Sequence, residues 1–111
     1  MTETALKYLS DILKAIELIE DFTKSVSNYN EFLNDLKTRS AVERQLSIIG
    51  EAVNKYGTLL PNQSLTNARK IVGFRNRLIH AYDAIDASII WAIIKNYIQP
   101  LKDEVKLLLQ S

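Results

Sequence analysis

Apolar residues recur at spacings of three and four along most of the chain, which is the pattern of one face of an α-helix. The first stripe spans residues 3–26 and consists of Ala5, Leu9, Ile12, Ile16, Ile19, Phe22 and Val26. Thr2 or Thr4 is suited to cap the start of this helix, because a threonine hydroxyl can accept a hydrogen bond from the backbone of the first turn. The turn-forming residues Ser25 to Asn28 predict its end.

A short helical turn is expected next, over residues 29–36. Its apolar side chains are expected to face inward, and they are Phe32, Leu33 and Leu36. The second long helix is predicted over residues 38–56. Its apolar stripe has the same spacing and consists of Val42, Leu46, Ile49, Val53 and Tyr56.

Three further features bear on the second long helix. Ser40 and Glu43 have the spacing of a capping box at its start, although the helix could begin earlier, and Gly57 favours its end. Gly50 lies inside the helix at a cost of about 1 kcal/mol against alanine, and a close approach of another backbone would explain that glycine. The apolar arc is widened on one side, which predicts a second packing neighbour or a dimer contact, by Ala41, Ile48 and Ala52.

The third helix follows a loop over residues 58–63 that contains Pro61. It is predicted to begin at Ser64 or Thr66 and to run to the end of the segment FRNRLIHAYD, residues 74–83. That segment holds the chain's single histidine and two arginines separated by one residue.

A turn over residues 83–86 is expected to precede the fourth helix, with Asp86 as its N-cap. The apolar stripe of this helix consists of Ile90, Ile94, Tyr97, Leu101, Val105 and Leu108. Pro100 lacks a backbone N–H group and predicts a kink near residues 96–100. Because neither strand alternation nor a repeat is visible, we predict an all-α fold: an antiparallel up-and-down four-helix bundle with an additional short helix. The length suits a single domain, residues 1–111.

Composition narrows the possible chemistry. The absence of cysteine excludes disulfides and cysteine-based metal or redox sites, and a single histidine excludes a His-rich metal site within one chain. Three scattered glycines provide no phosphate-binding loop, and the absence of a nucleophile-elbow motif excludes a serine triad of that kind. Together with the lack of metal-ligating cysteines and histidines, this predicts neither a cofactor nor a bound metal. No signal peptide is visible, and the longest apolar stretch, around Ile89 to Ile94, is too short to span a bilayer. We therefore expect a cytoplasmic protein with no membrane partner.

Charge is unevenly distributed along the chain. The formal net charge is only +1, but no acidic residue occurs between Glu51 and Asp83. The basic residues of that interval are Lys55, Arg69, Lys70, Arg75 and Arg77. They predict a basic face suited to a polyanion, unless acids of neighbouring helices balance it.

Arg75 has an unusual position on the predicted third helix. On a helical projection it lies within the apolar arc, between Ile71 and Ile79. A guanidinium in that position must be paired, extend to the surface, or line a polar cavity. The opposite arc is rich in hydrogen-bond donors and carries Arg69, Lys70, Asn76, Arg77 and His80.

Histidine and arginine together suit cleavage of RNA without a metal. His80 would take the proton from a ribose 2′-hydroxyl, because histidine exchanges protons near neutral pH. Arg75 would hold the scissile phosphate and stabilise its charge in the transition state. Asn76 lies four residues before His80 and could orient the imidazole or contact the ribose.

The spacing of the two residues imposes a condition on such a site. Arg75 and His80 are five residues apart and diverge by about 140° on a regular helix. Either the helix is distorted near His80, or a second copy of the chain completes the site. A symmetric dimer would also supply a second histidine, so that separate residues could act as general acid and general base.

Three blocks of the sequence occur in an order that is typical of one family. The central block, RNRLIHAY, is an R-x4-H-x-Y motif and continues the run IVGFRNRLIH at residues 71–80. The flanking blocks are IIGEAV at residues 48–53 and DASIIWAIIKNYIQPLKDEV at residues 86–105. Together they cover most of the chain and resemble the HEPN superfamily, specifically its HepT-like toxin subunits. Ala81 stands where glycine is frequent in that family.

The resemblance implies an HEPN-like helical fold and a homodimeric, metal-independent endoribonuclease toxin that cleaves RNA, either tRNA or mRNA. By their places in the motif, Arg75 and His80 would be catalytic, and Asn76 would be a supporting polar residue. Tyr82 would be the acceptor of AMP groups added by a partner, a minimal nucleotidyltransferase antitoxin of the MntA type. The candidate contacts to RNA phosphates are Arg69, Lys70 and Arg77.

Structural roles are the alternative for each of these residues. His80 could be a satisfied helix-end histidine, and Tyr82 could pack at the end of the bundle with its hydroxyl in water. Arg75 could pair with an acid such as Glu51, unless Glu51 forms a solvated pair with Lys55. For the function, the alternative is a non-catalytic helical module that binds substrate or nucleotide and partners a minimal nucleotidyltransferase.

Overall fold

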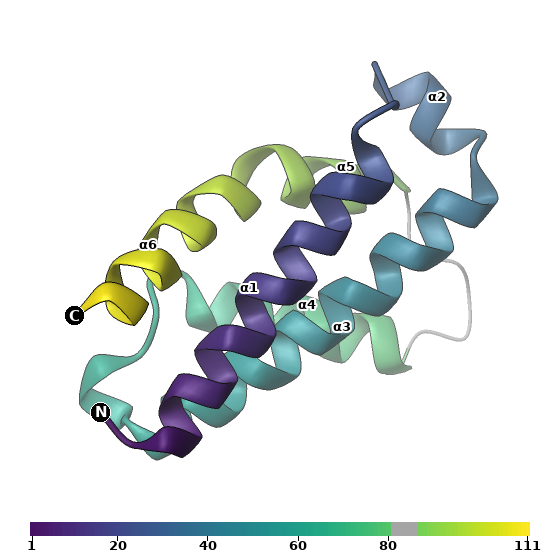
Figure 1. Ribbon diagram of the computed structural model, residues 1–111. Helices are drawn as coiled ribbons and strands as arrows, with labels where there is room; N and C mark the ends of the chain where they lie inside the picture. The colour runs from purple at the N-terminus through teal and green to yellow at the C-terminus, as the bar shows by residue number, and fades with distance from the viewer. Residues whose placement is uncertain (81–86) are drawn as a thin grey trace.

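The two longest helices, α1 (Glu3–Thr23) and α3 (Leu36–Leu59), run antiparallel and pack along each other (Figure 1). The computed structural model describes residues 1–80 and 87–111, with the backbone alone for residues 78–80. The apolar stripes of α1 and α3 supply most of the buried core, including Leu9, Ile12, Ile16, Val42, Ile49 and Tyr56. Both long helices therefore form where the apolar pattern predicts them, although α1 ends at Thr23, before the predicted end at Val26.

Side chains cap the starts of both long helices. The Thr2 hydroxyl accepts a hydrogen bond from Ala5 N at 3.1 Å, which confirms the predicted cap. The Asp35 carboxylate accepts from Thr38 Oγ1 at 2.6 Å and from Thr38 N at 3.0 Å, and these two bonds lower the pKa of its carboxyl. The predicted capping box that begins at Ser40 is wrong, because Asp35 starts the helix more than one turn earlier.

The short helix α2 (Tyr29–Leu33) joins the two long ones. Phe32 is fully buried and packs against Trp91 of α5 (Ala87–Asn96), with the ring centroids 5.3 Å apart. The prediction that Leu33 and Leu36 also face inward is wrong, since they are 39% and 69% exposed. A helix of five residues can turn only one narrow side toward the core, and Leu36 already belongs to the first turn of α3.

The segment after α3 departs from the prediction at both of its ends. Gly57 does not end α3, which continues to Leu59, and no glycine of the chain has a positive φ. Pro61 then begins the 3-10 helix η1 (Pro61–Gln63). Asn67, with φ 63°, reverses the chain just before α4 (Ala68–His80), so the third long helix begins later than predicted. Thr66 anchors this corner by donating from its backbone N–H to the Glu104 carboxylate at 3.1 Å.

The predicted fourth helix consists of two helices, α5 and α6 (Ile98–Gln110), which meet at Tyr97. Pro100 has no N–H group to donate to the carbonyl of Asn96, the residue at which α5 ends. The kink predicted near Pro100 is therefore confirmed, as a break between two helices. The predicted turn over residues 83–86, including its cap Asp86, lies outside the described residues.

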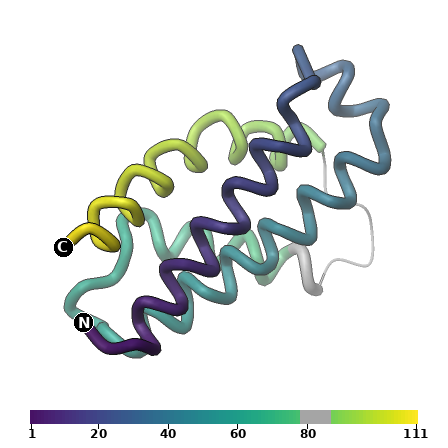
Figure 2. Tube along the Cα trace, viewed as in Figure 1, coloured from purple at the N-terminus to yellow at the C-terminus, as the bar shows by residue number. Residues whose placement is uncertain are grey.

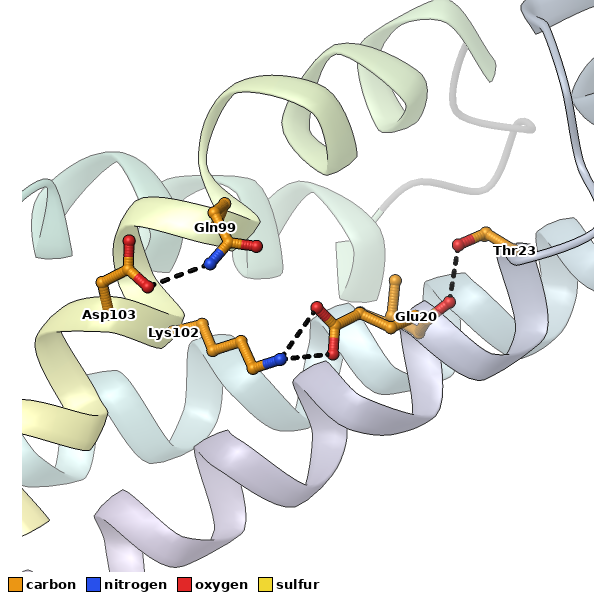
Figure 3. A network of polar contacts seen from close by, with 6 residues as sticks. Glu20, Thr23, Gln99, Lys102 and Asp103 are labelled. Carbon is orange, nitrogen blue, oxygen red and sulfur yellow. Dashed lines mark hydrogen bonds and ion pairs between the residues drawn. The ribbon is translucent and has the colours of Figure 1, made fainter.

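The last helix, α6, closes the bundle against α1, and the two chain ends lie at the same end of the molecule (Figures 1 and 2). Lys102 Nζ on α6 donates to Glu20 Oε1 on α1 at 2.9 Å, and this bond raises the pKa of Lys102 (Figure 3). No strand occurs in residues 1–80 or 87–111, so the predicted all-α bundle is confirmed. None of the helices in these two ranges is both long and apolar enough to cross a membrane.

Tyr56 provides a test of the core packing. Its side chain is fully buried, and its hydroxyl has no hydrogen-bond partner among the described residues. Burial raises the pKa of this hydroxyl. Because an unpaired buried hydroxyl is unfavourable, we expect Tyr56→Phe to raise the free energy of unfolding by about 1 kcal/mol in urea denaturation. A decrease of similar size would instead show that the hydroxyl is bonded in the folded chain. Tyr56→Leu, which removes the ring, should destabilise the chain.

Candidate active site at the contact of α3 and α4

One side of α4 packs on α3, and the other side is open to solvent. On the packed side, Phe74 is buried and Ile71 is half-buried. The open side carries the exposed residues Arg69, Lys70, Gly73, Asn76 and Arg77. The predicted division of the third helix into an apolar side and a donor-rich side is therefore confirmed for the part whose side chains are described.

Gly50 of α3 lies directly against Arg75 of α4. A Cβ atom added at residue 50 would overlap the Cβ atom of Arg75, and it would lie 2.7 Å from Arg75 Cγ and 3.3 Å from the carbonyl oxygen of Ile71. The close approach expected at Gly50 is thus confirmed. It places the aliphatic stem of Arg75 against the bare backbone of α3.

The residue Arg75 is half-buried at this contact. Its Nε atom is inaccessible to solvent and has no hydrogen-bond partner among the described residues. Its Nη1 atom donates to Asn76 Oδ1 at 3.2 Å. Within residues 1–80 and 87–111, no carboxylate forms an ion pair with it. Arg75 therefore combines a partly desolvated positive charge with guanidinium donors that bond only Asn76 among the described residues, which is an arrangement suited to a phosphate oxygen.

Glu51, the acid considered as a partner for Arg75, instead pairs with Lys55 at 3.0 Å on the surface of α3. The hydrogen bond from Lys55 is the main cause that lowers the pKa of the Glu51 carboxyl, and the charge of Arg75 adds a smaller contribution. The solvated Glu51–Lys55 pair is confirmed, and the structure gives no Glu51–Arg75 ion pair.

The three candidate phosphate contacts are all exposed, but they do not all lie together. Arg69 and Arg77 are separated by about 80° around α4, on its open side. The Nζ atom of Lys70 lies 6.0 Å from the centre of the Tyr97 ring, which turns this lysine toward the α5–α6 junction. Around α4, Arg69 lies about 20° from Asn76 and Arg77 about 20° from Lys70, so the candidates divide between two parts of the open side.

The remaining two predicted site residues fall at or beyond the end of α4. His80 is the last residue of the helix, whose backbone is helical without interruption from Ala68 to His80. A distortion between Arg75 and His80 that would remove their expected divergence is therefore absent. Tyr82 lies outside the described residues, so its predicted role stays a prediction.

The wide apolar arc of α3 has an explanation within one chain. α3 packs against α1 on one side and against α4 on another. Ala52, one of the three residues that widen the arc, is buried, and Ala41 and Ile48 are half-buried. The predicted second neighbour of α3 is confirmed as α4, but the residues that widen the arc lie toward α1, because Ile48 and Ala52 line a small hollow together with α1 residues such as Tyr8.

A polar hollow between the end of α3 and the start of α4 was not predicted. It holds about 360 Å³ and is lined by Val53, Asn54, Gly57, Thr58, Pro61, Ser64, Ala68, Arg69 and Val72. All of these residues fall in the stretch without acids between Glu51 and Asp83. The lack of acids in that stretch was the signal of the hollow available in the sequence. Which residues of the stretch face one another depends on how α4 packs against α3.

The sequence comparisons agree with the resemblance of the three blocks. The model of the family "Ribonuclease HepT-like" matches residues 12–108. "Probable ribonuclease HepT" of Thermococcus cleftensis is 42% identical over 99 residues, which cover 86% of each chain. "Putative RNase MJ1380" of Methanocaldococcus jannaschii is 39% identical over 104 residues, which cover 90% of this chain and 92% of the relative. "Putative RNase TTE0752" of Caldanaerobacter subterraneus is 35% identical over 110 residues, or 98% and 97% of the two chains.

No solved structure matches the chain. The family match spans, at least in part, all six α-helices of residues 1–80 and 87–111, from within α1 to within α6, and it includes the contact of Gly50 with Arg75. The relatives match over most of their own length, and the R-x4-H-x-Y segment lies on and just after α4. The chain therefore belongs to the HepT-like ribonuclease family.

Proposed function

We propose that this chain is a metal-independent endoribonuclease and the toxin subunit of a cytoplasmic toxin–antitoxin pair. The ribonuclease names of the relatives support RNA, either tRNA or mRNA, as the substrate. The observation that carries the proposal is Arg75, a half-buried residue whose guanidinium has an inaccessible Nε, is bonded to Asn76 and forms no ion pair with the described residues. Such a group can bind the scissile phosphate and stabilise the charge that develops on it.

In the proposed reaction, His80 removes the proton of a ribose 2′-hydroxyl, and that oxygen attacks the adjacent phosphorus. The bond from phosphorus to the 5′-oxygen of the next nucleotide breaks, the leaving oxygen takes a proton from water, and the protonated His80 releases its proton to the solvent. The products are a 2′,3′-cyclic phosphate and a 5′-hydroxyl end. Incubation of the purified chain with end-labelled RNA in excess EDTA should yield these ends, whereas cleavage that stops in EDTA would contradict a metal-independent mechanism.

Asn76 is proposed as a supporting residue that acts on Arg75. Its side-chain oxygen accepts from Arg75 Nη1 at 3.2 Å, and this bond limits the orientations of the guanidinium. The four-residue spacing between Asn76 and His80 also allowed Asn76 to orient the imidazole, but the role proposed here is to orient Arg75.

The complete site is proposed to form between two copies of the chain. The uninterrupted helix between Arg75 and His80 supports this, because the two residues diverge by about 140° around a regular helix. In a symmetric dimer, Arg75 of one copy and His80 of the other would face the same phosphate, and each of the two sites would contain one of each.

Tyr82 is proposed as the switch of the toxin, modified by an MntA-type nucleotidyltransferase antitoxin. Each AMP joined to its hydroxyl would add a phosphate of about one negative charge, which Arg75 could bind in place of RNA. We expect Tyr82→Phe to remain folded and to cleave RNA, but to escape neutralisation by the transferase with ATP. Intact-mass spectrometry should show AMP on the wild-type chain and none on the variant. Equal AMP addition to Tyr82→Phe would place the acceptor at another residue, and Tyr97→Phe serves as a matched control.

A further inference from the structure

The hollow between α3 and α4 is an open depression with the volume of a small ligand site. At about 360 Å³ it falls within the range of small-molecule pockets, roughly 300–1,000 Å³. Its inner wall includes Val53, which is buried, and Ala68 and Val72, which are half-buried. An apolar wall of this kind suits the flat face of a nucleobase.

The outer part of the hollow is polar and basic. Its exposed polar residues are Asn54, Thr58, Ser64 and Arg69. The amide and the two hydroxyls can both donate and accept hydrogen bonds, as the edge of a base and a ribose require. Arg69 can pair with a phosphate, and none of the described residues that line the hollow is acidic. The charge of the hollow therefore complements a nucleotide and not a cationic ligand.

The hollow also leads to Arg75. On α4, Val72 of the hollow is followed three and four residues later by Arg75 and Asn76, which places them on neighbouring parts of one face. On α3, Val53 lies three residues after Gly50, the contact of Arg75. At about 1.5 Å per residue, the hollow begins roughly 5 Å along α4 from Arg75, which is within reach of an adjacent nucleotide.

We propose that this hollow binds one unpaired nucleotide of the RNA strand, next to the phosphate held by Arg75. The base lies on the wall that includes Val53 and Val72, and its phosphate pairs with Arg69. The inference rests on the proposed function for the position of the scissile phosphate. Single-stranded RNA should bind better than a duplex, because a paired base would first have to be unpaired and leave its stack to enter the site.

Gly57 allows the hollow to be filled without disturbing the fold. It lies on the hollow within α3, and a Cβ atom there would meet nothing closer than Ser64 Cβ at 3.7 Å, an ordinary contact distance. Gly57→Ala should therefore be tolerated or favourable in the helix. Gly57→Leu should in addition occupy the space proposed for the base.

The first experiment measures binding of a short single-stranded 2′-O-methyl RNA by fluorescence anisotropy, because this RNA lacks the 2′-hydroxyl and is not cleaved. We expect Gly57→Leu to raise Kd by roughly tenfold or more, the loss of one nucleotide's contacts, while its urea midpoint does not fall below that of the wild type. An unchanged Kd would overturn the proposal. If the urea midpoint of Gly57→Leu falls below that of the wild type, the Kd of Gly57→Ala, which has a smaller side chain, is compared with that of the wild type instead.

The second experiment compares two arginines. Arg69→Ala should weaken binding and lower the slope of log Kd against log salt by about 0.7, the value for one phosphate contact on a single strand. Arg44→Ala, an exposed arginine of α3 outside the hollow, should change the slope much less. Equal slopes for Arg69→Ala and the wild type would overturn the phosphate contact.

The outcomes separate this inference from the proposed function. If the chain cleaves no RNA but its RNA binding depends on Gly57 and Arg69, the nucleotide site is supported and the nuclease function is contradicted. If Gly57→Leu cleaves RNA with the KM of the wild type, the nuclease function is supported and the proposed nucleotide site is contradicted. If Gly57→Leu instead converts a dimer into a monomer in sedimentation while RNA binding persists, the hollow receives a second copy of the chain and not RNA.

Discussion

Gly50→Ala is expected to lower the free energy of unfolding by about 3 kcal/mol, the upper part of the usual range for overpacking. The added methyl group would overlap Arg75 Cβ and crowd the Ile71 carbonyl. Cβ atoms are fixed to the backbone, so no change of rotamer relieves the overlap, and α4 must move away from α3. The gain in helix propensity, about 1 kcal/mol, is too small to offset this. Urea denaturation followed by circular dichroism measures the loss.

Gly73→Ala is the matched control, because it makes the same chemical change on the other helix of the contact. Gly73 is exposed on α4, and an added Cβ atom would meet nothing within 4 Å. We expect this variant to gain up to about 1 kcal/mol from helix propensity. Equal stabilities for the two variants would show that α3 and α4 do not touch at Gly50 and Arg75.

Mixing two inactive variants is expected to restore RNA cleavage. If Arg75 of one copy works with His80 of the other, Arg75→Ala and His80→Ala are each inactive as homodimers. In a mixed dimer, one site loses both residues and the other keeps both. Random pairing makes half of the dimers mixed, so about a quarter of the wild-type activity should return.

The mixing experiment requires exchange of subunits, which co-expression of the two variants with different tags ensures. Purification through both tags isolates the mixed dimer, which should retain about half of the wild-type activity. No activity in that sample, together with a stable dimer in sedimentation, would place both residues of each site in the same chain.

Features that depend on neighbouring residues were predictable from the sequence. The apolar stripes of α1 and α3 specify their helices, Thr2 caps α1, and the missing N–H group of Pro100 divides α5 from α6. The errors arose where two local signals compete. Asp35 and Ser40 are both residue types that cap helices. The helix starts at the earlier of the two, Asp35, because the residues that follow it, from Leu36 on, are already helical.

Features that depend on distant residues were only partly predictable. Gly50 indicated a close contact, but nothing near it in the sequence identified Arg75 as the contacting residue, since the pairing depends on how α4 crosses α3. The hollow was missed for the same reason, because Asn54 of α3 and Arg69 of α4 line it together only when the chain turns back through η1 and Asn67. The R-x4-H-x-Y segment identified the candidate residues without showing how they are supported.

The most direct test of the proposed function is the rate of RNA cleavage by His80→Ala in excess EDTA. A nuclease that uses this histidine as its proton carrier should lose about 10²-fold or more of its rate, while circular dichroism shows an unchanged helical spectrum. The alternative function, a non-catalytic module that presents nucleotide to a transferase, does not need a proton carrier. Cleavage by His80→Ala at the wild-type rate would contradict the proposed mechanism.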